Sequence, residues 1–305
     1  MELWRQRGEQ RDRFVALDMA YHGDTVGSVS VGGIELFHSM YRPLLFDTIK
    51  VPPGDAGAMD RALAAHPGEV AAVIMEPLVQ GAAGMLVHPE GYLRSVRKLC
   101  DRHGVLLILD EVATGFARTG RMFACEHEGV SPDFMCLAKG ISGGYLPLAA
   151  TLATEAVYEG FLGEFEEFRT FFHGHTYTGN PLACAAALAS LDVFEEERTL
   201  ERVERSITLL GELLGPLEAH PMVREVRRCG LMTGIELEPH PPPLRIGHRV
   251  ALEARRRGAI IRPLGDVVVL MPPLSISEPD LRRLVKITGE AIAAATTAAT
   301  PAVAA

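Results

Sequence analysis

Two side chains follow apolar runs at positions where they could do chemistry together. Asp110 directly follows the apolar run Val105–Leu109, and Lys139 directly follows the apolar run Phe134–Ala138. Short unbroken apolar runs are typical of strands buried on both faces. Open α/β sheets bind their ligands at the carboxyl ends of their strands. The sequence therefore predicts that both side chains lie at the binding edge of one sheet.

Each of these side chains also has an ordinary structural explanation. Asp110 and Glu111 could cap the next helix or turn, and this motif alone favours that interpretation. Lys139 could be a solvated lysine after a strand. The residues that follow the lysine argue against this, because Gly140 and the run Ser142-Gly-Gly form a loop that lets backbone approach a ligand closely.

A lysine in such a loop is suited to bonding covalently with an aldehyde. Its amine must lose a proton before it can attack, and burial makes that loss easier. A carboxylate on a neighbouring strand end would keep a pyridine nitrogen protonated. Asp110 and Lys139 are thus the two groups that pyridoxal phosphate needs.

The elements that must position these side chains alternate along the first part of the chain. Apolar runs at Phe14–Ala20 and Val70–Met75 join the two already named, and apolar residues at helical spacing occur over Met59–Ala65 and Gly91–His103. Residues 1–8 look like the end of a helix without a capping residue. Alternating strands and helices predict an α/β fold with a mostly parallel, doubly wound sheet.

A change of pattern near residue 198 predicts a domain boundary. An apolar helix begins at Pro181 and runs to about Glu197, and a second helix covers Leu200–Leu217. A smaller α+β domain, residues 199–290, is predicted from strands and helices at Val223–Arg228, Leu231–Glu238, Arg245–Arg257, Ala259–Arg262, Val267–Met271 and from Glu278 onward. Residues 291–305, almost all Ala and Thr, are expected to fray.

Composition restricts the class of protein. The 305 residues are 48% hydrophobic and 23% charged, which indicates a globular domain rather than a disordered chain. A net charge of −9 without any basic run argues against a nucleic-acid partner. No membrane span and no targeting segment is evident, and the five scattered cysteines form no C-x-x-C pair. We expect a cytoplasmic protein with reduced cysteines and no metal site.

Three motifs in order resemble a known family. The chain is similar to class III aminotransferases of pyridoxal-phosphate fold type I from about Trp4 to about Glu290. The similarity rests on Asp110-Glu-Val-Ala-Thr-Gly-Phe-Ala-Arg-Thr-Gly120, Ala138-Lys139-Gly140 and Thr176-Tyr-Thr-Gly-Asn-Pro-Leu-Ala-Cys-Ala-Ala-Ala187. It implies an enzyme that uses pyridoxal 5′-phosphate to move an amino group.

Further segments are most similar to one subgroup, the adenosylmethionine-8-amino-7-oxononanoate aminotransferases of biotin synthesis. These are Tyr21-His-Gly-Asp-Thr-Val-Gly27, Ala124-Cys-Glu-His127, Lys139-Gly-Ile-Ser-Gly-Gly-Tyr-Leu-Pro-Leu148 and Phe172-His-Gly-His-Thr-Tyr-Thr-Gly-Asn-Pro181. The resemblance implies S-adenosylmethionine as amino donor and 8-amino-7-oxononanoate as acceptor. Another ω-amino acid or diamine transaminase, or an aminomutase with the same cofactor, is the alternative.

The resemblance also implies roles at matched positions around the cofactor. Lys139 would hold pyridoxal phosphate covalently and relay a proton, and Asp110 would pair with its pyridine nitrogen. Tyr21 and Val112 would lie against opposite faces of the ring, and the alternative for Tyr21 is a half-buried core tyrosine. Glu76, at the end of another strand, would help orient the site.

The remaining implied roles concern the substrate and a second subunit. Thr176 would donate to the cofactor phosphate of the neighbouring subunit, which requires a homodimer with shared active sites. Arg262 would receive a substrate carboxylate, a task that suits the bidentate guanidinium. Arg118, Gly174 and Tyr21 would also lie near the substrate, and a solvated surface position is the alternative for Arg118.

The sequence departs from the family pattern at two places. Family members carry a Gly-Ser loop upstream of the Tyr-His-Gly motif that cups the cofactor phosphate at a helix N-terminus, and this sequence begins after that point. We expect a misassigned start, with a truncated, non-catalytic chain as the alternative. Val269 stands where many members of the subgroup have a tyrosine close to the substrate.

Overall fold

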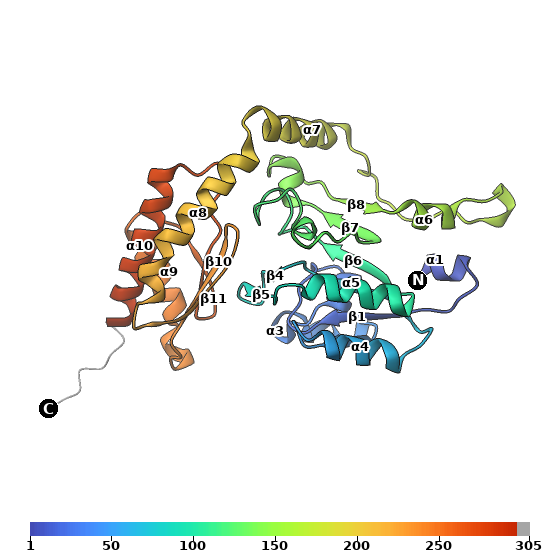
Figure 1. Cartoon of the computed structure of the whole chain (residues 1–305), viewed down its shortest axis with the longest axis horizontal. Helices are drawn as coiled ribbons and strands as arrows, with labels where there is room; N and C mark the ends of the chain where they lie inside the picture. The colour runs from blue at the N-terminus through green and yellow to red at the C-terminus, as the bar shows by residue number, and fades with distance from the viewer. Residues whose placement is uncertain (298–305) are drawn as a thin grey trace.

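A six-stranded sheet forms the core of the first part of the chain (Figure 1). The structure is a computed structural model and describes residues 1–297. The strand order is β2-β1-β3-β6-β7-β8, in which β8 alone is antiparallel to its neighbour. The bounds are β1 Arg13–Leu17, β2 Thr48–Val51, β3 Val70–Met75, β6 Leu106–Asp110, β7 Phe134–Leu137 and β8 Ala150–Ala153. The predicted α/β fold with a mostly parallel sheet is confirmed.

Helices pack on this sheet with their apolar faces inward. Apolar side chains at helical spacing in α5 (Tyr92–His103), among them Leu93 and Val96, share one buried cluster with Leu107 and Leu109 of β6. The helix ends because Gly104 adopts the left-handed conformation, with φ of 61°. The other helices of this part are α1 Glu2–Gln6, α2 Val26–Val31, α3 Glu35–His38, α4 Ala56–Ala65, α6 Glu155–Tyr158 and α7 Pro181–Glu196.

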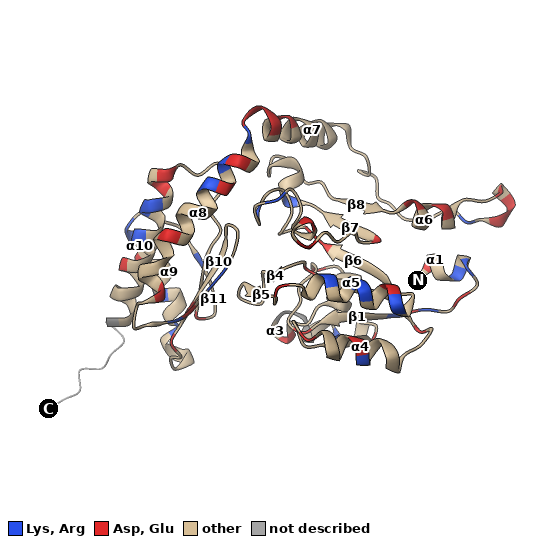
Figure 2. Cartoon of the chain, in the orientation of Figure 1, with Lys and Arg blue, Asp and Glu red and all other residues tan. Residues whose placement is uncertain are grey.

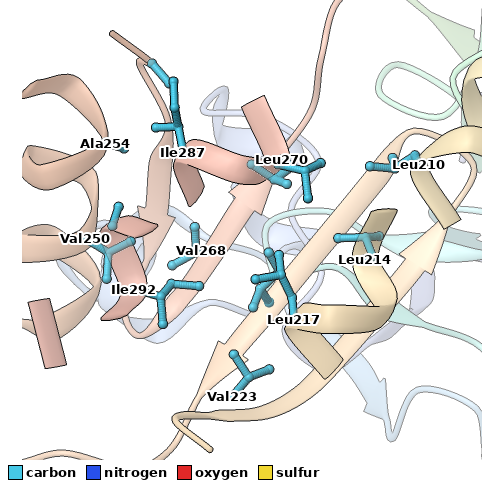
Figure 3. Packing of buried hydrophobic residues seen from close by; sticks show 14 of the residues in the cluster. Leu210, Leu214, Leu217, Val223, Val250, Ala254, Val268, Leu270, Ile287 and Ile292 are labelled. Carbon is cyan, nitrogen blue, oxygen red and sulfur yellow. The ribbon is translucent and has the colours of Figure 1, made fainter. Parts of the chain in front are cut away.

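A second, antiparallel sheet lies in residues 199–297, which we call the C-terminal unit. Its strand order is β11-β12-β10-β9, and helices α8, α9 and α10 pack against it. Figure 3 shows side chains from the helices and strands, such as Leu214, Val250, Val268 and Ile292, meeting in one buried cluster. The bounds are α8 Thr199–Glu218, β9 Val223–Cys229, β10 Met232–Leu237, α9 Ile246–Arg256, β11 Arg262–Leu264, β12 Val267–Leu270 and α10 Glu278–Thr297.

A small hairpin contacts the second sheet, and a helix joins the first part of the chain to the C-terminal unit. The hairpin of β4 (Val79–Gln80) and β5 (Leu86–Val87) extends from the first sheet toward β9. The long helix α7 leads into α8 (Figure 1). The division of the chain into domains at residue 198 stays a prediction. Short 3-10 helices cover Ser39–Leu44 (η1), Ala124–Glu128 (η2), Lys139–Ser142 (η3), Glu159–Phe161 (η4), Phe165–Glu167 (η5) and Pro242–Leu244 (η6).

Two of the local predictions that differ from the structure lie in its C-terminal part. The strand predicted at Ala259–Arg262 lies instead at Arg262–Leu264, because its partner in register is the strand β12. The predicted tail was wrong for residues 291–297, which continue α10. Ala291 and Ile292 are fully buried there, and alanine is the strongest helix former. Residues 298–305 lie outside the described part. Within residues 1–297, no helix is long and apolar enough to cross a membrane.

Candidate active site

The carboxyl ends of four adjacent parallel strands meet at one edge of the first sheet. Strands β1, β3, β6 and β7 are neighbours in that order. Tyr21 follows β1, Glu76 follows β3, Asp110 ends β6 and Lys139 follows β7. Cys136, just before the lysine, is the register partner of Asp110. The structure thus brings these four predicted site residues to one edge, as expected for a ligand site in an open α/β sheet.

Asp110 is held through both of its carboxylate oxygens. Its Oδ2 lies 2.8 Å from Nδ1 of His22, and the backbone amide of Val112 donates to Oδ1 at 3.1 Å. An ionised carboxylate can only accept, so Nδ1 of His22 donates. Both side chains are largely buried, with exposed fractions of 11% for Asp110 and 2% for His22. The carboxylate is therefore fixed in position, and each oxygen keeps further acceptor capacity.

Glu76 is a second buried acid beside this pair. Its Oε2 accepts a hydrogen bond from the amide of Gly81 at 3.0 Å. Burial raises the pKa of Glu76 to about 7, and the negative charge of Asp110 adds to the rise. The amide of Gly81 and the side chain of His22 act in the opposite direction. Glu76 is therefore able to gain or lose a proton near neutral pH.

The neighbouring acid, Glu111, has a structural task. It is fully buried and accepts hydrogen bonds from Oγ1 of Thr114 at 2.5 Å and from the amides of Ala124 and Cys125 at 3.0 and 2.8 Å. These two amides begin the 3-10 helix η2 and would otherwise lack acceptors. Glu111 thus caps η2, whereas Asp110 accepts the local amide of Val112 through one oxygen and pairs with His22 through the other.

Lys139 begins the 3-10 turn η3 with a φ of 45°, a strained conformation for a residue other than glycine. The turn is held against its surroundings, because a Cβ on Gly140 would lie 2.7 Å from Cβ of Phe116. The sequence predicts a buried amine, but Lys139 is exposed in the single chain. The reason is that the residues after it, 143–147, are exposed as well.

The two predicted substrate arginines lie near one cavity. Arg262 opens the edge strand β11 and lines a cavity of about 500 Å³ together with Val269 and Pro272. Nη1 of Arg118 donates to the carbonyl of Pro272 at 2.5 Å. Burial lowers the pKa of Arg118, so a solvated surface position does not describe it. Their roles toward a substrate stay predictions.

Two further predicted site residues are not brought to the sheet edge within the single chain. Thr176 and Gly174 lie in an exposed segment just before α7. The amide of Tyr177 donates to Nδ1 of His175 at 3.1 Å, which fixes the turn locally. A role for Thr176 in an active site therefore depends on a second copy of the chain, as the sequence resemblance implied.

His22 is the site residue that the sequence argument missed as a candidate. Its Nε2 is buried and has no hydrogen-bond partner among the described residues. A buried polar atom of this kind calls for a partner. The available signal was its place next to Tyr21 after a strand, in the Tyr-His-Gly motif that was already singled out.

Comparison with known proteins shows the family of this chain. Residues 2–292 match the family Aminotransferase class-III. Adenosylmethionine-8-amino-7-oxononanoate aminotransferase of Nitratidesulfovibrio vulgaris is 60% identical, and the match covers 94% of this chain and 57% of that protein. The enzyme of the same name from Geobacter sulfurreducens is 51% identical, over 93% of this chain and 68% of that protein.

Solved structures agree. The crystal structure of adenosylmethionine-8-amino-7-oxononanoate aminotransferase from Methanocaldococcus jannaschii superposes with a TM-score of 0.93 at 44% identity, over 96% of this chain and 70% of that chain. An amine transaminase from an uncultivated Pseudomonas species, in its PLP-bound form, superposes with a TM-score of 0.90 at 37% identity, over 96% and 72%. The chain thus spans 57% of the length of one similar curated relative and about 70% of the solved ones. From the sequence match and the shared fold, we conclude that the chain belongs to the class III aminotransferase family.

Proposed function

We propose that this chain carries the active-site residues of a pyridoxal-phosphate-dependent aminotransferase. It would transfer an amino group from S-adenosylmethionine to 8-amino-7-oxononanoate and form 7,8-diaminononanoate for biotin synthesis. The observation that carries the proposal is the meeting of Glu76, Asp110 and Lys139 at the ends of adjacent strands. The choice of substrates rests on the name shared by relatives that are 39 to 60% identical.

The residues at the sheet edge fit the aromatic part of pyridoxal phosphate. Asp110 is fixed by His22 and the amide of Val112, yet it can still accept a hydrogen bond from a protonated ring nitrogen. Lys139 is exposed, so its amine would be able to reach an aldehyde. When bound, the cofactor would supply an aldehyde that condenses with amines and a ring that withdraws electrons from the amine-bearing carbon.

The protein's own residues would then direct the proton movements. Asp110 would keep the ring nitrogen protonated, because a negative charge in a largely buried position favours the charged partner. Nζ of Lys139 would take a proton from the amine-bearing carbon and return it at the aldehyde carbon of the cofactor. General acid-base catalysis of this kind contributes roughly 10²–10⁴-fold.

Arg262 and Arg118 would bind the substrate at the wall of the cavity near Pro272. Arg262 is exposed, so its guanidinium can receive a carboxylate in the bidentate manner. Arg118 is anchored to the carbonyl of Pro272 by one nitrogen, and its remaining donors are free to turn toward a ligand. The keto acid acceptor offers the carboxylate that this pair would need.

We also propose that two copies of the chain form a homodimer with shared active sites. Large apolar side chains that are mostly exposed gather in residues 145–191, which is more than a monomer normally leaves in water. Helix α7 carries no Lys or Arg, and its acidic residues lie toward its C-terminal end (Figure 2). The exposed set includes Tyr145, Phe165, Phe172, Tyr177, Leu182 and Leu188.

This surface links the dimer to the chemistry. Thr176 lies within it, so pairing of two copies could carry the threonine to the partner's cofactor phosphate. The same pairing would cover Lys139 and exclude water from its amine. Sedimentation velocity of the purified chain tests the dimer: we expect a species of twice the chain mass, and a monomer at all concentrations would contradict the shared site.

The function is tested on the purified 305-residue chain with added pyridoxal phosphate. We expect a visible absorbance band that borohydride reduces and that S-adenosylmethionine bleaches, followed by formation of 7,8-diaminononanoate once the acceptor is added. Lys139→Ala should abolish turnover and the borohydride-reducible linkage. A variant that transaminates at the parent rate would remove Lys139 from the mechanism.

The other outcomes separate the alternatives. Absence of any band would support a non-catalytic chain, because the cofactor would not be held. A band that bleaches with a diamine or an ω-amino acid but not with S-adenosylmethionine would favour another class III transaminase. Val269, in place of the subgroup's tyrosine, is the observation that makes this comparison of donors necessary.

We propose the cytoplasm as the site of action. All five cysteines are free thiols, and none of them forms a disulfide within the described residues. Burial raises the pKa of Cys100 and Cys125 to about 12, so these thiols are unreactive. Unpaired, protonated thiols suit a reducing compartment. Detection of the native protein in a periplasmic or secreted fraction would contradict the proposal.

A further inference from the structure

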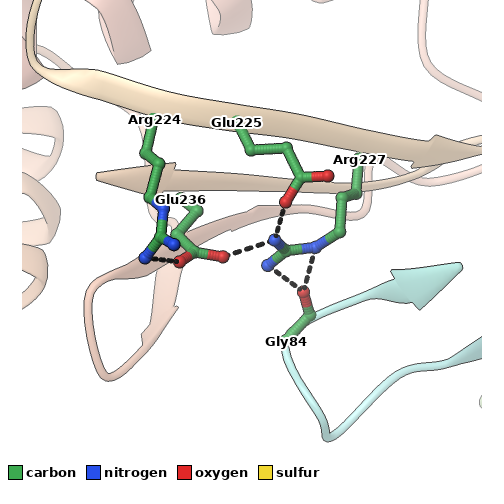
Figure 4. Close-up of polar contacts among 5 residues, drawn as sticks. All are labelled: Gly84, Arg224, Glu225, Arg227 and Glu236. Atoms are coloured by element: carbon green, nitrogen blue, oxygen red, sulfur yellow. Dashed lines mark hydrogen bonds and ion pairs between the residues drawn. The ribbon is translucent and has the colours of Figure 1, made fainter. Parts of the chain in front are cut away.

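A single arginine of the C-terminal unit holds the hairpin that leads to the site. Arg227 on β9 donates to the carbonyl of Gly84 from Nη2 at 2.9 Å and from Nε at 3.3 Å. Its Nη1 donates to Glu225 at 2.5 Å and to Glu236. Figure 4 shows the guanidinium between the two carboxylates and the tip of the hairpin. The Arg227 side chain is 12% exposed and its hydrogen bonds to Gly84 are partly buried, whereas Glu225 is 56% exposed.

Glycines allow the backbone of the hairpin to lie close to the backbone of the C-terminal unit. A Cβ on Gly234 of β10 would lie 2.8 Å from the carbonyl oxygen of Gly84, so only glycine fits there. Gly84 has a φ of 87°, a conformation that side-chain-bearing residues rarely adopt. Val79, Met85 and Met232 form a separate buried cluster beneath the tip. The hairpin is thus seated on the C-terminal sheet by shape as well as by hydrogen bonds.

The start of the same turn contacts the catalytic edge, and it is tied to the tip because the amide of Gly84 donates to the carbonyl of Gly81 at 3.2 Å. The amide of Gly81, directly after β4, donates to Oε2 of Glu76 at 3.0 Å. The side-chain amide of Gln80 donates to the carbonyl of Asp18 at 3.0 Å, in the loop that leads to Tyr21. A displacement of the tip would therefore change the positions of Glu76 and of the loop that leads to Tyr21.

We propose that Arg227 is a positioning residue of the active site. By fixing the carbonyl of Gly84, it sets the place of the Gly81 amide and, through it, the orientation of the Glu76 carboxylate beside His22 and Asp110. The role requires the fork of the guanidinium, because two of its donors converge on one carbonyl while a third faces the carboxylates. Its effect on turnover rests on the function proposed above, whereas its effect on the hairpin does not.

Arg224 on the same strand offers a matched control. Its Nη1 lies 3.4 Å from Glu236, its side chain is 59% exposed, and no hydrogen bond or ion pair joins it to the hairpin among residues 1–297. Arg224→Lys and Arg227→Lys make the same chemical change on one strand and keep the charge. Both remove a guanidinium that faces Glu236, whereas Arg227→Lys also removes the bidentate donor to the hairpin and the contact with Glu225.

Hydrogen exchange of the cofactor-loaded full chain tests the mechanical part. In Arg227→Lys we expect the amides of residues 77–87 to exchange about tenfold faster, since a shielded charge-assisted hydrogen bond is lost. Gly234→Ala should accelerate the exchange of the same amides, because its Cβ would push the Gly84 carbonyl away from the C-terminal sheet. Arg224→Lys should leave them unchanged. Parent-like exchange of this segment in both Arg227→Lys and Gly234→Ala would overturn the proposal, whether or not the chain is active.

Steady-state kinetics tests the link to the site. Arg227→Lys should lower kcat by about tenfold, because a displaced catalytic group is costly, while KM for both substrates stays within about twofold, since Arg227 touches neither. Arg224→Lys should match the parent in both constants. Faster exchange of the hairpin with an unchanged kcat would refute the positioning role. An inactive parent would instead refute the proposed function, and the exchange data would still decide whether Arg227 holds the hairpin.

Discussion

Replacement of Glu76 by Gln should remove a pH-dependent loss of stability. Burial raises the pKa of Glu76 from 4.5 to about 7, so between these values the folded chain holds a proton that the unfolded chain releases. Stability falls with rising pH wherever the folded state binds more protons. Integrated from pH 5 to pH 8, this difference in proton binding lowers the free energy of unfolding by about 2.5 kcal/mol.

The variant isolates this contribution from the groups that face the carboxyl. These are the amides of Gly81 and Tyr21, the side chain of His22 and the carboxylate of Asp110. Gln keeps an oxygen for the amide of Gly81 but cannot ionise. The difference in unfolding free energy between the variant and the parent should therefore shift by about 2.5 kcal/mol in favour of the variant from pH 5 to pH 8.

The protein's single tryptophan gives the assay. Trp4 is 5% exposed and donates from Nε1 to the carbonyl of Ala71 at 3.0 Å, on the strand β3 that ends just before Glu76. Urea unfolding followed by its fluorescence at pH 5, 6, 7 and 8 yields the free energies. Glu69→Gln is the control, because Glu69 lies at the start of the same strand and its side chain is 50% exposed.

Two outcomes decide the matter. Glu69→Gln should follow the pH dependence of the parent, since an exposed carboxylate contributes little. If the curve for Glu76→Gln also runs parallel to that of the parent from pH 5 to pH 8, Glu76 is ionised throughout that range. The argument from burial would then be refuted.

Two further predictions concern other buried groups. Burial lowers the pKa of His88 from 6.5 to about 4, so its contribution to the free energy of unfolding is present above pH 6.5 and is lost as the pH falls. At pH 4.5 this loss amounts to about 2.5 kcal/mol. His88→Asn should abolish it, as measured by unfolding followed by Trp4 fluorescence. An unchanged acid sensitivity would contradict this. A Cβ at Gly247 would overlap the carbonyl oxygen of Gly265, so Gly247→Ala should destabilise the C-terminal unit by about 2 to 3 kcal/mol in thermal unfolding followed by circular dichroism. A parent-like Tm would show that the backbone adjusts without cost.

Much of the sheet could be predicted because several of its strands are unbroken apolar runs. The strand Val70–Met75 has the predicted bounds, and Phe134–Leu137 differs from the prediction by one residue. An unbroken apolar run is a strong local signal of such strands. The strand β8 gave no such signal, because Leu152 and its neighbours at this edge of the sheet are exposed. The hairpin strands β4 and β5 are too short to show any periodicity.

The candidate site likewise has features that the sequence predicts and features that only the fold decides. The sequence by itself determined that Asp110 and Lys139 follow apolar strands and that glycines surround the lysine. It also determined that the motifs belong to one family. Strand ends, glycine loops and motifs are all local patterns, so they can be read from neighbouring residues. Only the tertiary structure decided that Glu111 caps η2 while Asp110 pairs with His22, and that Arg227 contacts Gly84. These partners are far apart in the chain, and hydrogen bonds between distant residues depend on how sheets and helices pack rather than on any local pattern.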